Sequence, residues 1–564
     1  MEIGFRGAPQ VEAAVGAGLE GLGFELATTT TPLIVAGTPD DFPSFNAERT
    51  FIAIEVGGIG GYAIDGVEAS IAVIGPEGPC RRCLKRRVEA STSTPVEPST
   101  PSSESARYAG AVAGRLIHQT GVEALDQRLG VVRLLDGGER RVLPVPGCSC
   151  EREFDRFDAG TEDPPAGEAL DRAELAVDPI LGIIAQVGEQ SSYPAPYYIA
   201  EVADTTGFSD ARAARYAAGV DLDWDDAFMR AIGEGLERYC AGCYHLDALP
   251  EEPKGRAIEL ADIATADDDG SALGRWWPAI DLNTEENVSL PAEAVTFPPP
   301  AEADITGITT GLGLGATWTD AVLAGLVEVI ERDACMLGWY STYEPLELEV
   351  NHEPYQILTQ RLAGEGLAST ALVMTQDIDI PVVTAVVHRR DGEGDALLDI
   401  PGVDPDAWPS FAVGSAASLD PAVAAERALA EAGQNWIELL GMGPERAAQE
   451  GAIGEFATYP RQARTLLKSW PKVDAATIAP SGIEDAQSAI DHCLTETARA
   501  GLSMYAARTT TRDVASLGFE AVRVVSPEAQ PLVRDRTHFA DRLSSVPREL
   551  GFRPRLDRGD HPYP

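Results

Sequence analysis

The sequence predicts a mixed α/β protein of two domains, and three observations support this prediction. Short apolar stretches such as 50–56 (TFIAIEV) indicate strands in the first part of the chain. Further along, strand-like runs such as 381–387 (PVVTAVV) alternate with long alanine-rich helical segments. Between these parts, the polar stretch 154–168 contains a Pro-Pro pair and is typical of a linker. We therefore expect domains of residues 1–165 and 166–564.

The composition excludes several classes of partner. The 564 residues include 89 Asp+Glu and 44 Lys+Arg, which gives a formal net charge of −45. Such a surface repels nucleic acids and anionic membranes. The acids are scattered, and lysine is scarce, as in the cytosolic proteins of organisms that accumulate salt. Because 44% of the residues are hydrophobic, the chain has enough apolar material for folded cores.

The location expected from the sequence is the cytoplasm. The sequence contains no apolar run of about 18 residues. Its start also lacks the basic segment followed by an apolar segment that marks a secretory signal. Eight cysteines are too few for a disulfide scaffold. Cysteine pairs at short spacing are therefore interpreted as metal ligands.

Two such pairs lie in the first domain. Cys80 and Cys83 precede a Ser/Thr/Pro/Glu-rich insertion at 89–105, and Cys148 and Cys150 follow it. Four thiolates satisfy tetrahedral Zn²⁺, and structural zinc knuckles present them as short-range pairs. The sequence thus favours a structural zinc site, with unlinked buried cysteines as the alternative.

Three long helices are expected in the second domain, at about 222–245, 317–339 and 420–440. The first two repeat the pattern E-x-x-E-R, with Glu234, Glu237 and Arg238 in one and Glu328, Glu331 and Arg332 in the other. Residues spaced i, i+3 and i+4 share one face of a helix. Small residues such as Ala231 and Gly325 flank the glutamates, which suggests room for a bulky polar ligand.

The third helix presents a related face, formed by Arg427, Glu431, Gln434 and Asn435. Glutamate pairs with interleaved arginines suit Mg²⁺ that carries phosphates. The chain has no G-x-x-x-x-G-K-[ST] loop, so carboxylate-held metal ions would replace the lysine of such a loop. A structural salt-bridge cluster remains an equally weighted alternative, and a merely solvated acidic face is the simplest one.

The same residues resemble a known family. Segments 219–244, 309–334 and 411–436 are similar, in order, to the three ATP-site segments of YcaO-domain proteins, and the resemblance extends over about 178–564. Members of this family use ATP to activate a backbone amide oxygen of a peptide. The usual product is an azoline ring formed by a Cys, Ser or Thr side chain, and relatives form thioamides or amidines.

The resemblance assigns roles to individual residues. It implies that Mg²⁺ is held by Glu234, Glu237, Glu328 and Glu331, and that ATP is bound by Arg238, Asp320, Arg332, Arg427, Glu431 and Gln434. The chain ends in Asp560-His561-Pro562-Tyr563-Pro564. This ending resembles the proline-rich tail of azoline-forming members, which enters the active site, so Pro562 and Pro564 are expected there.

The first domain is similar to the ubiquitin-activating-enzyme-like fold that azoline-forming members carry, with a zinc knuckle that helps to bind the leader of a ribosomally made precursor peptide. The leading hypothesis is ATP-dependent cyclodehydration of Cys, Ser or Thr in such a peptide. Thioamidation with a separate sulfur donor is one alternative, and a non-catalytic peptide-binding scaffold is another. By family analogy we expect a homodimer, and the sequence leaves open whether a separate leader-binding protein or a sulfur-donor partner is needed.

Overall fold

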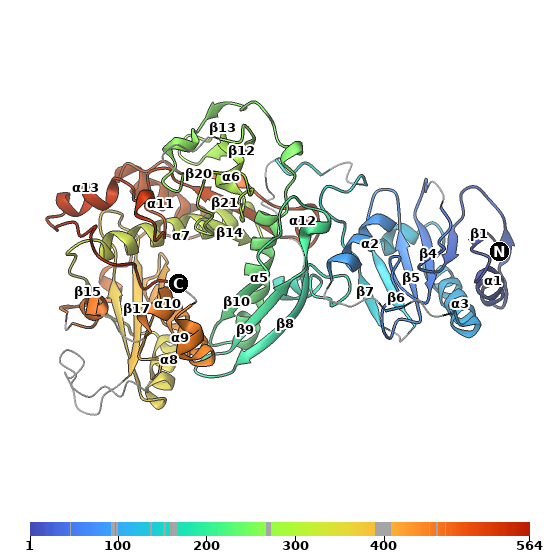
Figure 1. Ribbon diagram of the computed structural model, residues 1–564, viewed down its shortest axis with the longest axis horizontal. Helices are drawn as coiled ribbons and strands as arrows, with labels where there is room; N and C mark the ends of the chain where they lie inside the picture. Colours follow the sequence, from blue (N-terminus) through green and yellow to red (C-terminus); the bar gives the residue numbers. More distant parts are fainter. Residues whose placement is uncertain are drawn as a thin grey trace.

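The computed structural model describes residues 1–564 with short gaps. These gaps are 45–46, 92–95, 98–99, 136–137, 151–153, 158–159, 161–166, 267–271, 390–407, 450–451, 458–460 and 469. Most of the predicted linker 154–168 and part of the predicted insertion 89–105 lie outside the described residues. Figure 1 shows the N-terminal domain (blue) projecting from one side of a larger C-terminal part, in which the C-terminus lies between α7 and α9.

A seven-stranded sheet forms the N-terminal domain, in the order β2-β1-β3-β4-β5-β6-β7. The first four strands of that order run parallel, and the remaining pairs are antiparallel. The strands are β1 (Glu2–Gly7), β2 (Glu25–Ala27), β3 (Ile34–Gly37), β4 (Phe51–Val56), β5 (Ala69–Ile74), β6 (Val131–Leu134) and β7 (Glu139–Arg141).

Helices cover both faces of this sheet. α1 (Glu12–Glu20) and α3 (Ser103–Thr120) pack on one face, and α2 (Arg81–Ala90) packs on the other. Every residue of β4 and β5 is buried as a result. A strand covered on both faces carries a continuous apolar run, which explains the sequence TFIAIEV.

The described residues of the C-terminal part form three sheets, ordered β10-β9-β8, β11-β13-β12-β20-β21-β14 and β18-β17-β16-β15-β19. Their strands are β8 (Ile184–Ser191), β9 (Tyr197–Val202), β10 (Tyr216–Val220), β11 (Arg256–Ala257), β12 (Trp276–Asp281), β13 (Asn287–Pro291), β14 (Leu312–Gly315), β15 (Leu346–Glu349), β16 (Leu367–Val373), β17 (Val382–Arg389), β18 (Phe411–Ala417), β19 (Lys472–Asp474), β20 (Tyr505–Arg508) and β21 (Glu520–Val525).

The three long helices predicted from the sequence are confirmed as α5 (Trp224–Gly242), α7 (Trp318–Trp339) and α9 (Pro421–Ala447). α9 is longer than expected and bends at Gly443, whose φ is 72°. The other helices are α4 (Ala169–Glu174), α6 (Ala292–Val295), α8 (Glu353–Gly364), α10 (Ala452–Phe456), α11 (Ala486–Arg499), α12 (Arg512–Ser516) and α13 (Arg542–Glu549). No helix in the described ranges has the length and apolar character needed to cross a bilayer.

Each long helix follows directly on a glycine-containing strand, giving the units β10–α5, β14–α7 and β18–α9. Local sequence sets each helix start, because Asp223, Thr317 and Asp420 accept hydrogen bonds from amides of the first turn. In the strands, Gly219, Gly313 and Gly414 touch the following helix so closely that a Cβ atom would come within 2.4 Å of a helix backbone atom. Glycine is required at these three contacts.

The small residues that flank the glutamates pack against the strands, whereas the sequence suggested that they leave room for a ligand. Ala231, Ala321 and Ala428 are fully buried, and they form the surfaces that the strand glycines contact. They therefore allow the strand and helix backbones to approach and do not open space for a ligand. Close packing of this kind holds the helix faces, and the glutamates on them, at a fixed distance from the strands.

A buried charge cluster joins the two parts of the chain. Arg87 on α2 contacts Asp513 on α12, and the Tyr239 hydroxyl on α5 donates to the same carboxylate at 2.6 Å. Arg87 also donates to the Tyr239 oxygen at 3.3 Å and to the Pro144 carbonyl at 3.0 Å. All three charged or phenolic side chains are fully buried. The N-terminal domain is therefore fixed to the helix that carries Glu234 and Glu237.

Removing the acid of this cluster should be far more damaging than removing the phenol. Asp513→Ala leaves the Arg87 charge buried without its partner, a change that costs about 3–5 kcal/mol. Tyr239→Phe deletes one hydrogen bond and should cost about 1 kcal/mol. Chemical denaturation of both variants measures the difference, and equal losses would contradict the assignment of Asp513 as the countercharge of Arg87.

Candidate active site

Polar side chains of α5, α7 and α9 meet at a cavity of about 1610 Å³. Most of the residues predicted for ATP and Mg²⁺ line it, and the last residue of the chain also does. These lining residues are Glu234, Glu237, Arg238, Glu328, Arg332, Arg427, Glu431, Gln434 and Pro564. The structure thus brings together one face of each long helix and the C-terminal end.

The three strand–helix units hold their carboxylates in the same way. In each unit, a helix glutamate accepts a hydrogen bond from a backbone N–H of the preceding strand or of the residue before it. The pairs are Ala218 N to Glu234 at 2.6 Å, Gly311 N to Glu328 at 2.9 Å, and Ser415 N to Glu431 at 2.6 Å. The backbone hydrogen bond fixes one oxygen of each carboxylate, and each of these carboxylates lies at the cavity.

The carboxylates are crowded in this cavity. Burial, together with the neighbouring charges of Glu328 and Glu234, raises the pKa of Glu237 well above its ordinary value. Burial likewise raises the pKa of Glu328, and it raises the pKa of Glu431 to about 7. In the described part of the chain, Glu237 accepts no hydrogen bond. A cation between α5 and α7 would relieve this repulsion.

Arg332 lies at the centre of the acidic groups. Its guanidinium is 3.6 Å from Glu328 and 3.3 Å from Glu331. Although burial opposes the charge, the acidic neighbours Glu331, Glu328 and Glu431 raise the pKa of Arg332. The guanidinium therefore stays charged and faces the cavity, where it can bind a phosphate.

Glu331 differs from the other predicted metal ligands. Its two oxygens accept hydrogen bonds from the Ser415 hydroxyl at 2.7 Å and from Ala417 N at 3.1 Å. It is 8% exposed and is not among the described residues that line the cavity. Glu331 ties α7 to β18 and lies 3.3 Å from the Arg332 guanidinium, and its oxygens keep further lone pairs that could bind an ion.

Asp320 also lies away from the cavity wall. It is exposed in the first turn of α7, where its carboxylate accepts a hydrogen bond from the Thr317 hydroxyl at 2.8 Å. Its predicted contact with ATP stays a prediction.

Arg523 on β21 was not identified from the sequence. It is 4% exposed, and its charge partly offsets the burial that raises the pKa values of Glu237 and Glu328. Its Nε and Nη1 atoms have no hydrogen-bond partner in the described residues. The sequence feature that could have identified it is a single arginine inside the apolar strand EAVRVV. A buried cation needs a nearby anion, so this arginine indicates that an acidic group lies close to it.

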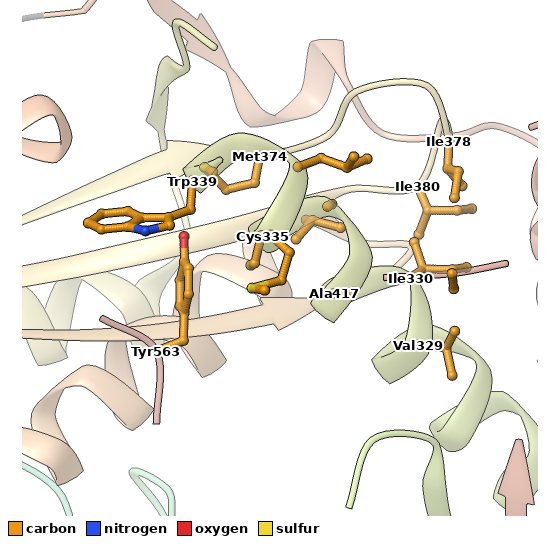
Figure 2. Close-up of a cluster of buried hydrophobic side chains, with 14 of the residues drawn as sticks. Val329, Ile330, Cys335, Trp339, Met374, Ile378, Ile380, Ala417 and Tyr563 are labelled. Carbon is orange, nitrogen blue, oxygen red and sulfur yellow. The ribbon is translucent and has the colours of Figure 1, made fainter. Parts of the chain in front are cut away.

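The predicted tail reaches the site. Pro564 lines the cavity, and the preceding Tyr563 is fully buried with its hydroxyl 3.1 Å from the Thr384 hydroxyl. Figure 2 shows the Tyr563 ring beside Cys335, with its hydroxyl pointing toward Trp339. Pro562 is buried and is not among the described residues that line the cavity. His561 is also buried, and burial together with Arg534 and Arg332 lowers its pKa to about 3.

The donor set fits a metal that carries a polyphosphate. Carboxylate oxygens are the ligands that Mg²⁺ prefers, and the charge of Glu328 contributes to the raised pKa of Glu237. Arginines on all three helices surround these acids. When bound, Mg²⁺ would neutralise phosphate oxygens and so favour phosphoryl transfer.

The four cysteines of the N-terminal domain come together as predicted. Their sulfur atoms all lie within 4.8 Å of one another. The Sγ–Sγ distances are 3.8 Å for Cys80–Cys83, 3.7 Å for Cys80–Cys148 and 3.5 Å for Cys83–Cys150. Contacts with the other thiols lower the pKa of Cys80 and, chiefly through Cys150, bring that of Cys148 to about 6. Four converging thiols fit a tetrahedral zinc ion.

The fold and the cavity define an α/β enzyme built to bind a metal-bound polyphosphate without a phosphate-binding loop. The chain belongs to the YcaO family. The family model described as YcaO cyclodehydratase, ATP- and Mg²⁺-binding, matches residues 218–530, which is more than half of the chain. The protein is therefore an ATP-dependent, cyclodehydratase-like enzyme.

Two solved structures share the fold over nearly the whole chain. A heterocyclase in complex with substrate and cofactor has a TM-score of 0.72 at 16% identity, covering 98% of this chain and 83% of that one. The heterocyclase TruD has a TM-score of 0.62 at 16% identity, covering 98% and 82%. The N-terminal domain is thus part of the shared architecture.

Two sequence relatives are uncharacterised proteins. One, from Methanothermobacter thermautotrophicus, is 27% identical over 344 residues, covering 58% of this chain and 85% of the relative. The other, from Rhizobium leguminosarum bv. trifolii, is described as lying in the tfuA 3′ region. It is 30% identical over 243 residues, covering 39% of this chain and 55% of the relative.

Proposed function

We propose that this enzyme uses ATP to convert Cys, Ser or Thr residues of a ribosomally made peptide to azolines. The observation that carries the proposal is the joint cavity, in which glutamates and arginines of three helices and the C-terminal Pro564 line one space. A tail at the phosphate site suits an enzyme that brings a peptide there.

The chemistry follows from the weakness of an amide oxygen as a leaving group. The thiol or hydroxyl of the peptide attacks the carbonyl carbon of the preceding residue and loses its proton. The former amide oxygen takes the γ-phosphoryl group of ATP and leaves as phosphate, while the amide nitrogen loses its N–H proton and forms the C=N bond of the ring. The products are an azoline, ADP, phosphate and a proton. Charge develops on the phosphoryl oxygens, which Arg332 and Arg427 would stabilise.

In this proposal, Glu234, Glu237, Glu328 and Glu331 hold Mg²⁺. Arg238, Arg332, Arg427, Glu431 and Gln434 surround the nucleotide, and Pro562 and Pro564 lie beside the peptide. The zinc-bearing domain contributes to binding the precursor peptide, with or without a separate leader-binding protein.

Phosphate release and peptide mass together test the function. We expect ATP hydrolysis to rise when a candidate precursor peptide is added, at low and at high salt. The peptide should lose one water for each modified residue. Replacement of oxygen by sulfur would instead indicate thioamidation with a sulfur donor. A wild-type enzyme that releases no phosphate in response to any Cys-, Ser- or Thr-containing precursor would refute both reactions.

A further inference from the structure

A second cavity, of about 500 Å³, lies on the other side of the C-terminal tail. Tyr563 lines this second cavity, whereas the next residue, Pro564, lines the cavity of the glutamates. The tail therefore forms a partition between the two spaces. A ligand in the second cavity would therefore lie beside Tyr563, the residue next to Pro564.

The second cavity is lined mainly by cations, whereas the chain as a whole is acidic. Three cationic residues line it, Lys468, Arg555 and Arg558, against one acid, Glu344. In the whole chain, acids outnumber bases by 89 to 44, and only four residues are lysine. A cationic cavity in such a chain concentrates anions locally.

Arg558 provides the second observation. Its guanidinium lies 3.5 Å from the centroid of the Trp339 ring, and it donates to the carbonyls of Trp339 and Gln462 and to the Thr465 hydroxyl. Among the described residues it pairs with no carboxylate. Burial is the main cause that lowers its pKa to about 10, and Arg555 is a like-charged neighbour that acts in the same direction. Two adjacent arginines without a shared acid leave a place for an external anion.

The walls indicate what kind of anion fits. Trp339, Tyr343 and Trp470 line the cavity beside the cations. Sites of this size that combine aromatic walls with a few charged groups suit an organic ligand better than a small inorganic ion. Arg555 remains available to such a ligand, because its side chain is 45% exposed and its contact with the exposed Asp557 is long, at 3.6 Å.

We propose that this cavity binds an acidic side chain of the substrate peptide close to the residue that is modified. The proposal rests on the proposed function, since it assumes that a peptide enters beside the tail. The carboxylate would lie between Arg555 and Arg558, and the aliphatic part of the side chain would lie against Trp470, which is only partly buried. The enzyme would then select Cys, Ser or Thr residues that have an acidic neighbour.

The test compares two blocked peptides that differ in one charge, acetyl-Glu-Ser-Gly-amide and acetyl-Gln-Ser-Gly-amide. Binding is measured by titration calorimetry and by tryptophan fluorescence without ATP, so that it does not depend on turnover. The acidic peptide should bind about tenfold more tightly to the wild-type enzyme. Arg555→Gln should bring the two affinities close to equality. This residue is exposed, so the variant should fold.

Arg499→Gln is the matched control, because Arg499 is an exposed arginine on α11 paired with Glu496. It should retain the tenfold preference. Equal affinities in the wild type, or a preference that survives Arg555→Gln, would overturn the proposal. Inorganic phosphate that binds more tightly than the acidic peptide would also overturn it and make the cavity a phosphate site. If the acidic preference is present but no azoline forms, the proposed reaction fails and the anion site stands.

Discussion

Glu237→Gln is expected to lower peptide-stimulated ATP turnover by roughly 100-fold or more, because it removes a charged ligand from the proposed metal site. The amide has the same shape as the carboxylate, so the packing of α5 should be unchanged. Turnover is measured as phosphate release over a range of Mg²⁺ concentrations. A loss at every concentration indicates an effect on catalysis, and a loss that Mg²⁺ restores indicates weakened metal binding.

The same variant should be as stable as the wild type, or more stable, in the absence of Mg²⁺. Burial and neighbouring acids raise the pKa of Glu237 in the folded state above its value in the unfolded chain. The ionised form therefore costs stability, and this cost grows as the pH rises from the unfolded pKa through the raised folded one. In thermal melts, the stability of the wild type should fall as the pH rises over this interval. The stability of Glu237→Gln should fall less over the same interval.

A binding measurement and a control variant test the assignment of Glu237 as a metal ligand. Mg²⁺ with a non-hydrolysable ATP analogue should raise the Tm of the wild type and have little effect on Glu237→Gln. Glu293→Gln is the control, because Glu293 is a buried carboxylate on α6 and is not among the described residues lining the cavity. It should retain turnover. Full activity of Glu237→Gln would refute the metal assignment.

Cys83→Ser is expected to lower the free energy of unfolding by at least about 3 kcal/mol, because structural zinc sites contribute directly to folding. Cys83 is fully buried, and its sulfur contacts those of Cys80 and Cys150. The purified wild-type protein should contain one zinc ion per chain after dialysis, and the variant should contain less. Metal analysis and chemical denaturation measure the two effects.

The loss should also reach the active site. Cys83 and Arg87 lie on the same helix, α2, and Arg87 contacts Tyr239, which follows Glu237 by two residues on α5. Arg512 extends this connection, since it donates to the Cys150 carbonyl at 3.1 Å. Chelation of zinc is therefore expected to reduce ATP turnover as well as stability.

Cys493→Ser is the matched control for the zinc prediction. Cys493 is a fully buried thiol on α11 and does not belong to the four-cysteine cluster. Its replacement should cost about 1 kcal/mol and should leave the zinc content unchanged. If Cys83→Ser retained one zinc ion per chain, or lost no more stability than the control, the cluster would not be a structural metal site.

The local features of this protein could be predicted from its sequence because they depend on neighbouring residues. Capping residues and apolar periodicity determined where α5, α7 and α9 begin, and the i, i+3, i+4 spacing put two glutamates and an arginine on one face of α5 and of α7. The spacing of the cysteine pairs likewise predicted the four-thiol cluster. Each of these inferences concerns groups that are close in the chain.

Only the tertiary structure decided which groups meet across long separations. It gave the flanking alanines their packing role against Gly219, Gly313 and Gly414, and it turned Glu331 toward Ser415. It also placed the buried Arg523 where its charge acts on Glu237 and Glu328. These outcomes depend on how strands from distant segments dock against the helices, and local spacing does not encode that docking. The sequence by itself determined the chemistry of each helix face, and the packing of the sheets decided which groups face the cavity.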